Sequence, residues 1–388
     1  MAESDVPDLR KFLAPEFIFG VGARRLAGRY ARNFGSRKAL VVTDPGVVRA
    51  GWAQDVLESL DGEGIEHVVF SGVTPNPKAE EVMRGVEFAR TEECDLLVAV
   101  GGGSPMDCAK GIGVVLSNRG HILDFVGVDQ IKAPMPPLIC VPTTGGTSAD
   151  LSQFAIITDR LTATKFAIIS KAVVPDVSLV DPLTLTTMPA ELSAQTGMDA
   201  LVHAIEAFVS RGRSEVTDLH ALEAVRLVAG NLEASIRKPM DVELRTKVMR
   251  ASLNAGLAFS NASLGAVHAM AHGLGGLLDL PHGECNALLL EHVVAFNYPE
   301  AEERFRQIAL AMGLDLGGMV PSAVKRAVEN EIRRLKAAVG LDRTLRADGV
   351  GRSDIPELAC RAVRDPTLVT NPRRATQRDL EVIYEESL

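Results

Sequence analysis

The hydrophobic pattern of this chain changes its period near residue 185, and this change constrains the fold more than any other feature. Before it, short apolar runs that end near turn residues alternate with helical segments such as 53–60 and 79–90. After Asp181-Pro182 the pattern is helical almost to the C-terminus. Strands alternating with helices predict a parallel sheet covered on both faces. We therefore expect an α/β domain at 1–185 followed by an all-α domain at 186–388.

The expected elements can be given by residue range. The strands are 39–43, 68–71, 96–100 and 138–142, with further β-rich runs at 154–158, 165–170 and 178–181. The later helices include 198–210, 214–236, 302–312 and 320–339. No low-complexity linker separates the two halves, so a functional site is expected between them.

Charge and composition exclude several classes of partner. The net charge of −9 argues against a nucleic acid or an anionic membrane, because phosphates are held mainly by clustered Lys and Arg. Residues 251–278 carry no full charge, but two Asn, several Gly and two His make them a poor membrane span and favour a buried helix pair. Five scattered cysteines and a start without a basic and apolar leader predict a cytoplasmic protein.

A glycine-rich turn follows the expected strand 96–100. Residues 101–107 read GGGSPMD and lead into a helical segment at 108–116. Glycines at a strand end let backbone N–H groups approach a phosphate, and a helix N-terminus adds a favourable dipole. The turn matches neither the GxGxxG fingerprint nor a P-loop. The alternative is a tight turn without a ligand.

Two further segments support a dinucleotide in the first domain. Residues 142–148, PTTGGTS, again follow a strand and offer hydroxyls and free amides. Asp44 follows the strand 39–43, where a carboxylate can accept hydrogen bonds from an adenosine ribose and would repel a 2'-phosphate. NAD is therefore expected rather than NADP. The alternative for Asp44 is an Asx-type turn before Pro45-Gly46.

Histidines and one aspartate suggest a metal in the second domain. Asp199 and His203 lie four residues apart, as do His268 and His272, so each pair shares a helical face. His282 follows a Leu-Pro turn. A carboxylate and imidazole nitrogens suit a divalent metal such as Fe(II) or Zn(II). Spacing alone leaves satisfied core histidines as an equal alternative.

Four motifs in order resemble the iron-containing (group III) alcohol dehydrogenases. They are GGGSPMDCAK at 101–110, PTTGGTSAD at 142–150, GMDALVHAIEAF at 197–208 and HAMAHGLGGLLDLPHGECNA at 268–287. The resemblance extends over essentially the whole chain. The first domain is then a Rossmann-like dinucleotide-binding domain, and the second binds metal and substrate. The segment PHGECNALLLEHVVAFN is most similar to members that act on small primary alcohols and diols, such as 1,3-propanediol or methanol dehydrogenases.

The resemblance implies a role for each matching residue. Four residues match the metal ligands, namely Asp199, His203, His268 and His282. His272 matches a further histidine near the nicotinamide, and we expect it to accept the proton of the alcohol, since an imidazole exchanges protons near neutral pH. The expected dinucleotide-binding residues are Asp44, Asn76, Gly102, Gly103, Ser104, Asp107, Thr143, Thr144, Thr147 and Lys165. The expected substrate-pocket residues are Phe154, Phe259 and Thr367.

One loop departs from the family pattern. Where the family reads GTGSE, this chain reads Gly146-Thr147-Ser148-Ala149-Asp150. Ser148 replaces a glycine and Asp150 is one methylene shorter than glutamate, so a change in loop geometry is expected.

The expected function is hydride transfer between a small alcohol, or its aldehyde, and NAD, assisted by Fe(II) or Zn(II). A homo-oligomer, a dimer or larger, is also expected. Three alternatives stay open at this stage. They are a same-fold lyase on an acidic substrate, a reductase on an acidic substrate, and a dehydrogenase-like regulatory protein that senses an alcohol or NAD.

Overall fold

A six-stranded parallel sheet forms the centre of the N-terminal half in the computed structural model, which describes residues 9–388. The strand order is β1-β9-β6-β4-β2-β3. The strands are β1 (Glu16–Phe19), β2 (Lys38–Val42), β3 (Glu66–Phe70), β4 (Leu96–Gly101), β6 (Leu138–Pro142) and β9 (Val177–Val180). Sequence reasoning predicted each of these except β1.

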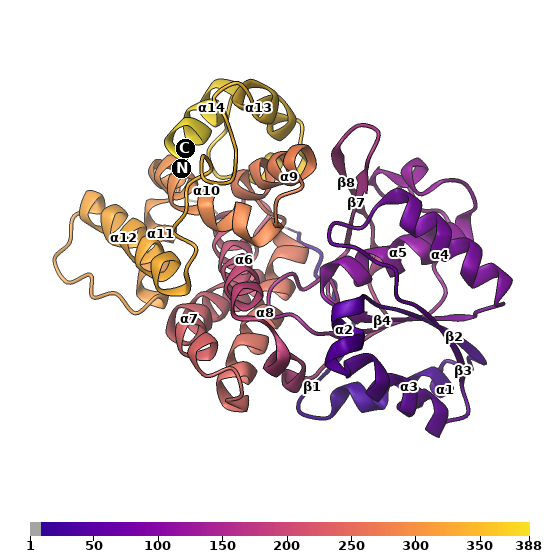
Figure 1. Ribbon diagram of the computed structural model, residues 1–388. Helices are drawn as coiled ribbons and strands as arrows, with labels where there is room; N and C mark the ends of the chain where they lie inside the picture. The colour runs from indigo at the N-terminus through magenta and orange to yellow at the C-terminus, as the bar shows by residue number, and fades with distance from the viewer. Residues whose placement is uncertain (1–8) are drawn as a thin grey trace.

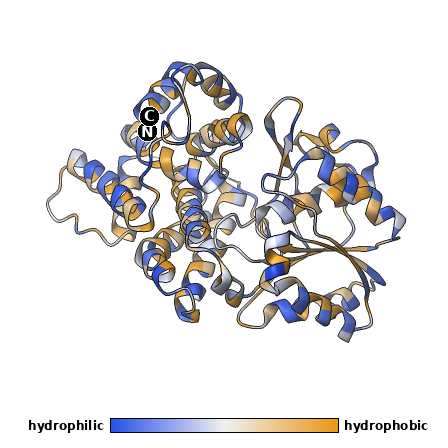
Figure 2. Cartoon of the chain, viewed as in Figure 1, coloured by the Kyte–Doolittle hydropathy of each residue, from blue (hydrophilic) through white to orange (hydrophobic). Residues whose placement is uncertain are grey.

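Helices cover both faces of this sheet because its central strands are apolar on both sides. In β2, Leu40 and Val42 enter the hydrophobic core on one face, while Ala39 and Val41 enter the core on the other. Helices α1 and α3 lie on one face, and α4 and α5 on the other (Figure 1). The helices are α1 (Ala27–Asn33), α2 (Pro45–Ala50), α3 (Trp52–Gly62), α4 (Ala79–Thr91) and α5 (Gly103–Asn118). Figure 2 shows the hydrophobic residues concentrated along the central strands.

A smaller sheet of three strands stands beside the large one. Its order is β5-β8-β7, and its strands are β5 (Gly127–Val128), β7 (Phe154–Asp159) and β8 (Thr164–Ile169). The hairpin β7–β8 is antiparallel, whereas β5 pairs parallel to β8. Short 3-10 helices complete this half at Ala23–Leu26, Ile122–Phe125, Lys171–Val173 and Pro182–Thr187. The last of these spans the expected domain boundary at residue 185.

The C-terminal half is helical, as expected. Its helices are α6 (Ala190–Val209), α7 (Glu215–Arg237), α8 (Val242–Ala262), α9 (Ala266–Leu278), α10 (His282–Asn297), α11 (Glu302–Ala311), α12 (Pro321–Val339), α13 (Ile355–Val363) and α14 (Gln377–Glu386), with 3-10 turns at Tyr298–Glu300 and Pro366–Thr370. Helix α6 is buried at every residue from Ser193 to Val209, because it lies at the centre of this lobe (Figure 1).

The uncharged stretch 251–278 forms the end of α8 and the whole of α9, a buried helix pair as expected. Within residues 9–388, every helix is too short or too polar to cross a lipid bilayer. The expectation that the chain lacks a leader depends on its opening residues, of which 1–8 lie outside the described part.

Candidate metal centre and cofactor-binding turns

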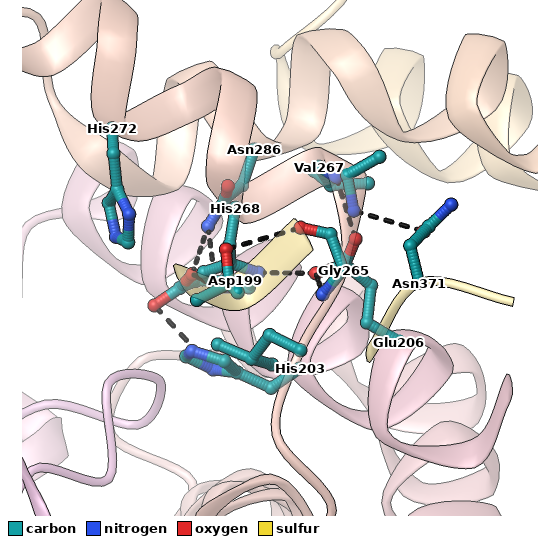
Figure 3. Close-up of polar contacts among 12 residues, drawn as sticks. Asp199, His203, Glu206, Gly265, Val267, His268, His272, Asn286 and Asn371 are labelled. Carbon is teal, nitrogen blue, oxygen red and sulfur yellow. Dashed lines mark hydrogen bonds and ion pairs between the residues drawn. The ribbon is translucent and has the colours of Figure 1, made fainter. Parts of the chain in front are cut away.

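Three helices of the C-terminal lobe bring Asp199, His268 and His282 together. One ligand atom of each lies within 4.8 Å of the others. Oδ1 of Asp199 is 3.8 Å from Nε2 of His268 and 3.8 Å from Nε2 of His282. Asp199 comes from α6 and His268 from α9 (Figure 3). His282 is the first residue of α10. A carboxylate oxygen and two imidazole nitrogens converging in this way can hold one divalent metal.

The start of α10 reaches this position because Gly283 follows His282. A Cβ on Gly283 would overlap the backbone carbonyl of Gln195 in α6. Glycine therefore lets α10 approach α6 one helical turn before Asp199. The same contact brings His282 to the carboxylate.

His203 lies beside this triad rather than inside it. Its Nδ1 is 3.9 Å from Oδ2 of Asp199 and has no hydrogen-bond partner, although the residue is only 4% exposed. Its ring stacks on His268 at 4.5 Å and on Phe259 at 4.2 Å between centroids. The structure thus brings together three of the four expected ligands, with the fourth in contact with two of them. An unpartnered buried nitrogen next to Asp199 fits a site that takes a metal.

The electrostatics of the centre also suit a metal. Burial, with the neighbouring histidines, lowers the pKa of His268 well below its ordinary value. Burial, with Lys165 and the other histidines, does the same for the pKa of His282. Neutral imidazoles are the form in which histidine binds a metal. The donor set therefore fits Fe(II) or Zn(II).

Asn286 is a residue of this centre that sequence reasoning missed. Its Nδ2 donates to Oδ1 of Asp199 at 2.7 Å and lies 3.2 Å from Nε2 of both His268 and His282. It is fully buried, and its Oδ1 has no partner. The available signal was its position four residues after His282, on the same face of α10.

Glu206 was missed in the same way. It follows His203 by three residues on α6 and is 3% exposed. Its carboxylate accepts hydrogen bonds from Nδ1 of His268 at 2.7 Å and from the backbone N–H groups of Gly265 and Val267 at 3.1 and 2.7 Å (Figure 3). Burial raises the pKa of Glu206 to about 7. A carboxylate behind a ligand histidine is a common device for orienting the ring.

His272 lies one turn beyond His268 on α9 and does not join the triad. Its Nδ1 is 2.8 Å from Oδ2 of Asp365, and its ring stacks on His282 at 5.4 Å between centroids. Asp365 also accepts from the backbone N–H and the hydroxyl of Thr367 at 2.9 and 2.6 Å. Burial opposes ionisation of Asp365, but His272 and Thr367 outweigh it and lower the pKa of that carboxyl. Nδ1 of His272 is thus bonded to Asp365, and Nε2 can bond to a ligand.

Of the three expected pocket residues, two are aromatic residues beside His203 and the third is bonded to Asp365. The ring of Phe154 is 6.0 Å from that of Phe259, which in turn covers His203. Two aromatic rings therefore form an apolar wall next to the metal centre. Thr367 is 3% exposed and its hydroxyl is directed to Asp365. The geometry gives Thr367 a role in fixing Asp365.

The two glycine-rich turns of the first domain lie side by side at the carboxyl end of the sheet. The N–H of Thr143 donates to the carbonyl of Gly101 at 2.9 Å. A Cβ on Gly102 would lie 2.9 Å from the Thr144 side chain, and one on Gly103 would lie 3.2 Å from Thr147. Glycine at these positions therefore lets the two turns pack closely. Ser104 follows in the first turn of α5, whose N-terminus has no side-chain cap and remains available to an anion.

The second of these turns also contacts the helix that carries Asp199. A Cβ on Gly146 would overlap the backbone of Thr196 in α6. Thr196 lies one turn before Asp199. The expected phosphate cradle and the metal centre are thus joined through a direct backbone contact.

Asp44 forms the Asx-type turn that the sequence left open as an alternative. It caps the N-terminus of α2, and its Oδ1 accepts from the N–H groups of Gly46 at 2.7 Å and Val47 at 3.0 Å. Both bonds use the same oxygen, so Oδ2 is left for a ligand. Because β2 neighbours β4, Asp44 lies at the same edge of the sheet as the glycine turn.

Of the remaining expected cofactor residues, Asn76 and Lys165 lie at the junction of the two lobes, whereas Asp107 lies within the first domain. Nζ of Lys165 donates to Oδ1 of Asn76 at 2.8 Å, and Nδ2 of Asn76 donates to Asp279 at the end of α9 at 2.7 Å. Asp107 accepts a backbone hydrogen bond from Ile156, and burial raises its pKa to about 6. Asp107 therefore holds β7 against α5.

The loop that departs from the family pattern is held by hydrogen bonds of Ser148 and Asp150. Ser148 has φ +49°, a conformation that favours glycine. Its hydroxyl donates to the carbonyl of Ser252 at 2.7 Å. Oδ2 of Asp150 accepts from the hydroxyl of Ser178 at 2.6 Å, and Asp150 is buried. The shorter acid is therefore satisfied inside the first domain.

A pair of variants should separate the two effects at Ser148. Ser148→Ala keeps the left-handed strain and loses the bond to Ser252, whereas Ser148→Gly loses the bond but relieves the strain. We expect the glycine variant to be the more stable by about 1 kcal/mol, the cost of a Cβ in this conformation. Urea midpoints of both variants measure the difference. An alanine variant as stable as the glycine variant would show that the backbone is not strained.

Known proteins resemble the chain along its whole length. Residues 14–182 match the family described as iron-containing alcohol dehydrogenase, and residues 193–388 match the C-terminal part of the Fe-containing alcohol dehydrogenase family. The 1,3-propanediol dehydrogenase of Citrobacter freundii is 40% identical over 97% of this chain and 98% of its own length. The NAD-dependent methanol dehydrogenase of Bacillus methanolicus is 36% identical over 97% of this chain and 99% of its own. A crystal structure of 1,3-propanediol oxidoreductase has a TM-score of 0.96 and 39% identity, covering 98% of this chain and 100% of that one.

A parallel-sheet domain with adjacent glycine turns, joined to a helical domain with an Asp–His–His centre, defines a two-domain, metal-dependent oxidoreductase. The chain belongs to the iron-containing alcohol dehydrogenase family. The fold and the family expected from the four motifs are therefore confirmed, as is the expectation of an enzyme that uses NAD and a divalent metal.

Proposed function

We propose that this protein transfers a hydride between a small primary alcohol or diol and NAD, at a divalent metal held by Asp199, His203, His268 and His282. The observation that carries the proposal is the convergence of Asp199, His268 and His282 within 4.8 Å, next to a glycine turn of the first domain that packs against α6 at Gly146. The relatives named for 1,3-propanediol and methanol support the substrate class.

Each group of the site has a separate task in this proposal. When bound, the metal supplies Lewis acidity toward the alcohol oxygen, and NAD supplies the acceptor for the hydride. The walls of Phe154 and Phe259 exclude water and favour a short apolar chain. His272, oriented by Asp365, takes the proton of the alcohol at Nε2. The turns around Gly102 and Thr143 cradle the phosphates of the dinucleotide.

Turnover and metal content should be measured on the same preparation. The full-length protein is depleted of metal, reloaded with Fe(II) or Zn(II), and tested with NAD against short primary alcohols, diols and their aldehydes. Metal-dependent reduction of NAD by a small alcohol or diol is the expected result. Binding of NAD or alcohol without turnover under any metal would instead favour the regulatory alternative.

Asp44 is proposed to set the preference for NAD over NADP. Asp44→Gly removes the carboxylate that would repel a 2'-phosphate, and glycine at a helix N-cap costs only a few tenths of a kcal/mol. The ratio of kcat/KM for NADP to that for NAD should rise about tenfold, equivalent to about 1.4 kcal/mol. Steady-state kinetics with both cofactors measure it.

Asp241 offers a matched control, because it caps α8 through the N–H of Leu244. Asp241→Gly should leave the cofactor ratio unchanged. An unchanged ratio in Asp44→Gly as well would mean that Asp44 serves only as a helix cap.

We further propose a homo-oligomer, a dimer or larger, in the cytoplasm. Strand β1 lies at the edge of the large sheet with Phe17 38% exposed, and such an edge favours pairing with another chain. All five cysteines are free, which suits a reducing compartment. Light scattering on the purified protein gives the oligomeric state.

A further inference from the structure

Glu206 links two features of the metal centre that lie far apart in the sequence. It is on α6, the helix of Asp199 and His203, and its carboxylate contacts both His268 and the beginning of α9 (Figure 3). The N-terminus of α9 has no side-chain cap of its own. Glu206 accepts hydrogen bonds from the N–H groups of Gly265 and Val267, and Oδ1 of Asn371 accepts one from the N–H of Ala266 at 3.1 Å. The first turn of the helix that carries His268 is thus anchored by buried residues from elsewhere.

The bond between Glu206 and His268 determines which ring nitrogen faces the metal. The carboxylate already accepts the N–H groups of Gly265 and Val267, and when ionised it can only accept, so Nδ1 of His268, 2.7 Å away, then carries the proton. Nε2 then keeps its lone pair, and it is this nitrogen that lies 3.8 Å from Asp199. In the opposite tautomer a proton on Nε2 would point at the metal position.

Glu206 also supplies charge. A divalent cation bound by one carboxylate, Asp199, and neutral imidazoles leaves one positive charge in excess. Asp199 and His268 are each 1% exposed, so this charge is buried and costly unless compensated. Glu206, itself 3% exposed, provides a second negative charge one imidazole ring away from the metal position.

We propose that Glu206 is a positioning residue of the metal centre, which fixes His268 as an Nε2 ligand and balances the charge of the bound metal. The proposal rests on the metal-dependent function proposed above. It assigns to Glu206 a role in metal affinity rather than in NAD binding, because its contacts are all on the side of α9.

Metal affinity of the full-length, metal-depleted protein tests this role. Co(II) is titrated by calorimetry and by its visible absorption spectrum. Glu206→Gln keeps the shape of the side chain but removes its charge and turns one oxygen into a donor, so either the bond from Val267 or those from Gly265 and His268 must be lost. We expect the dissociation constant for Co(II) to rise about 10–100-fold, as for other groups that orient metal ligands. The affinity for NAD should not change.

Asn371→Ala is the matched control. It removes the acceptor for Ala266 at the start of α9, together with the bonds to Asn297 and Arg373, but no hydrogen bond to His268. The Co(II) affinity should therefore stay within about twofold of the wild-type value, less than the change expected for an orienting group. An equal loss in both variants would show that anchoring of the helix, and not orientation of the ligand, is what matters, and would overturn the proposal.

A second measurement does not depend on the stability of a variant. Histidine-selective 15N NMR of the metal-free wild-type protein reports the tautomer of His268, assigned by comparison with His268→Gln. A proton on Nδ1 supports the proposal, and a proton on Nε2 overturns it. Wild-type protein that fails to bind Co(II) would overturn the metal centre itself, whereas wild-type affinity in Glu206→Gln would overturn only the role of Glu206.

Discussion

His268→Ala should leave the protein almost without metal and without activity. His268 is 1% exposed and provides one of the three ligand atoms that lie within 4.8 Å of one another. Loss of a partner that only orients a ligand typically lowers metal affinity by about 10–100-fold, so loss of the ligand itself should cost more than about 100-fold. Metal per chain, by elemental analysis, and kcat/KM with NAD measure the effect together.

The design needs a histidine that is not part of the centre. His220 is suitable, because its contacts are with residues outside the metal centre. Its Nδ1 is 2.9 Å from Oδ1 of Asn254, and its ring stacks on Phe12. His220→Ala should keep its metal and its turnover. Stoichiometric metal with normal turnover in His268→Ala would mean that the ligand assignment is wrong.

The fold was predictable because both halves obey simple periods. Leu40 and Val42 alternate with Ala39 and Val41 in β2, and burial on both faces gives the continuous apolar run of a parallel strand. Helix α6 shows the limit of periodicity. It is buried around its whole circumference, so the pattern identified a helix but could not say which face met the rest of the site.

The expected metal ligands were found from the sequence because they share helical faces or belong to recognisable motifs. The side chains that orient these ligands were not found from the sequence. Glu206 lies 62 residues from His268, Asp199 is 87 residues from Asn286, and Asp365 is 93 residues from His272. A hydrogen bond between segments so distant leaves no spacing in the sequence. These partners follow only from how α6, α9, α10 and the Pro366–Thr370 turn pack.

The glycines of α9 illustrate the same limit. Glycine weakens a helix by about 1 kcal/mol, so Gly275 and Gly276 look out of place in the sequence. In the structure a Cβ on Gly275 would lie 2.6 Å from Nζ of Lys165, and one on Gly276 would lie 2.9 Å from the carbonyl of Ala163. The hairpin β7–β8 packs on α9 at these two positions. The glycines therefore form one of the contacts between the two lobes.

His272→Ala should keep its metal but lose most of its turnover. Nδ1 of His272 is held by Asp365 at 2.8 Å, so this ring stands beside the centre as an oriented proton acceptor with Nε2 free. Loss of such a general base typically slows a reaction by about 10²–10⁴-fold. A water chain could recover part of this, and the expected loss in kcat is then nearer to about 10²-fold. Exogenous imidazole should restore part of the rate, because it replaces the missing base in the space left by the ring.

His282→Ala is the natural partner of this variant, because the two rings stack at 5.4 Å and the two roles could be exchanged. The geometry distinguishes them. Nε2 of His282 lies 3.8 Å from Asp199 and within the ligand triad, whereas His272 is bonded to Asp365. His282→Ala should therefore lose metal, and added imidazole should not restore turnover unless metal is restored as well. Metal lost from His272→Ala and retained in His282→Ala would reverse the two assignments, and with them the direction in which the proton leaves the site.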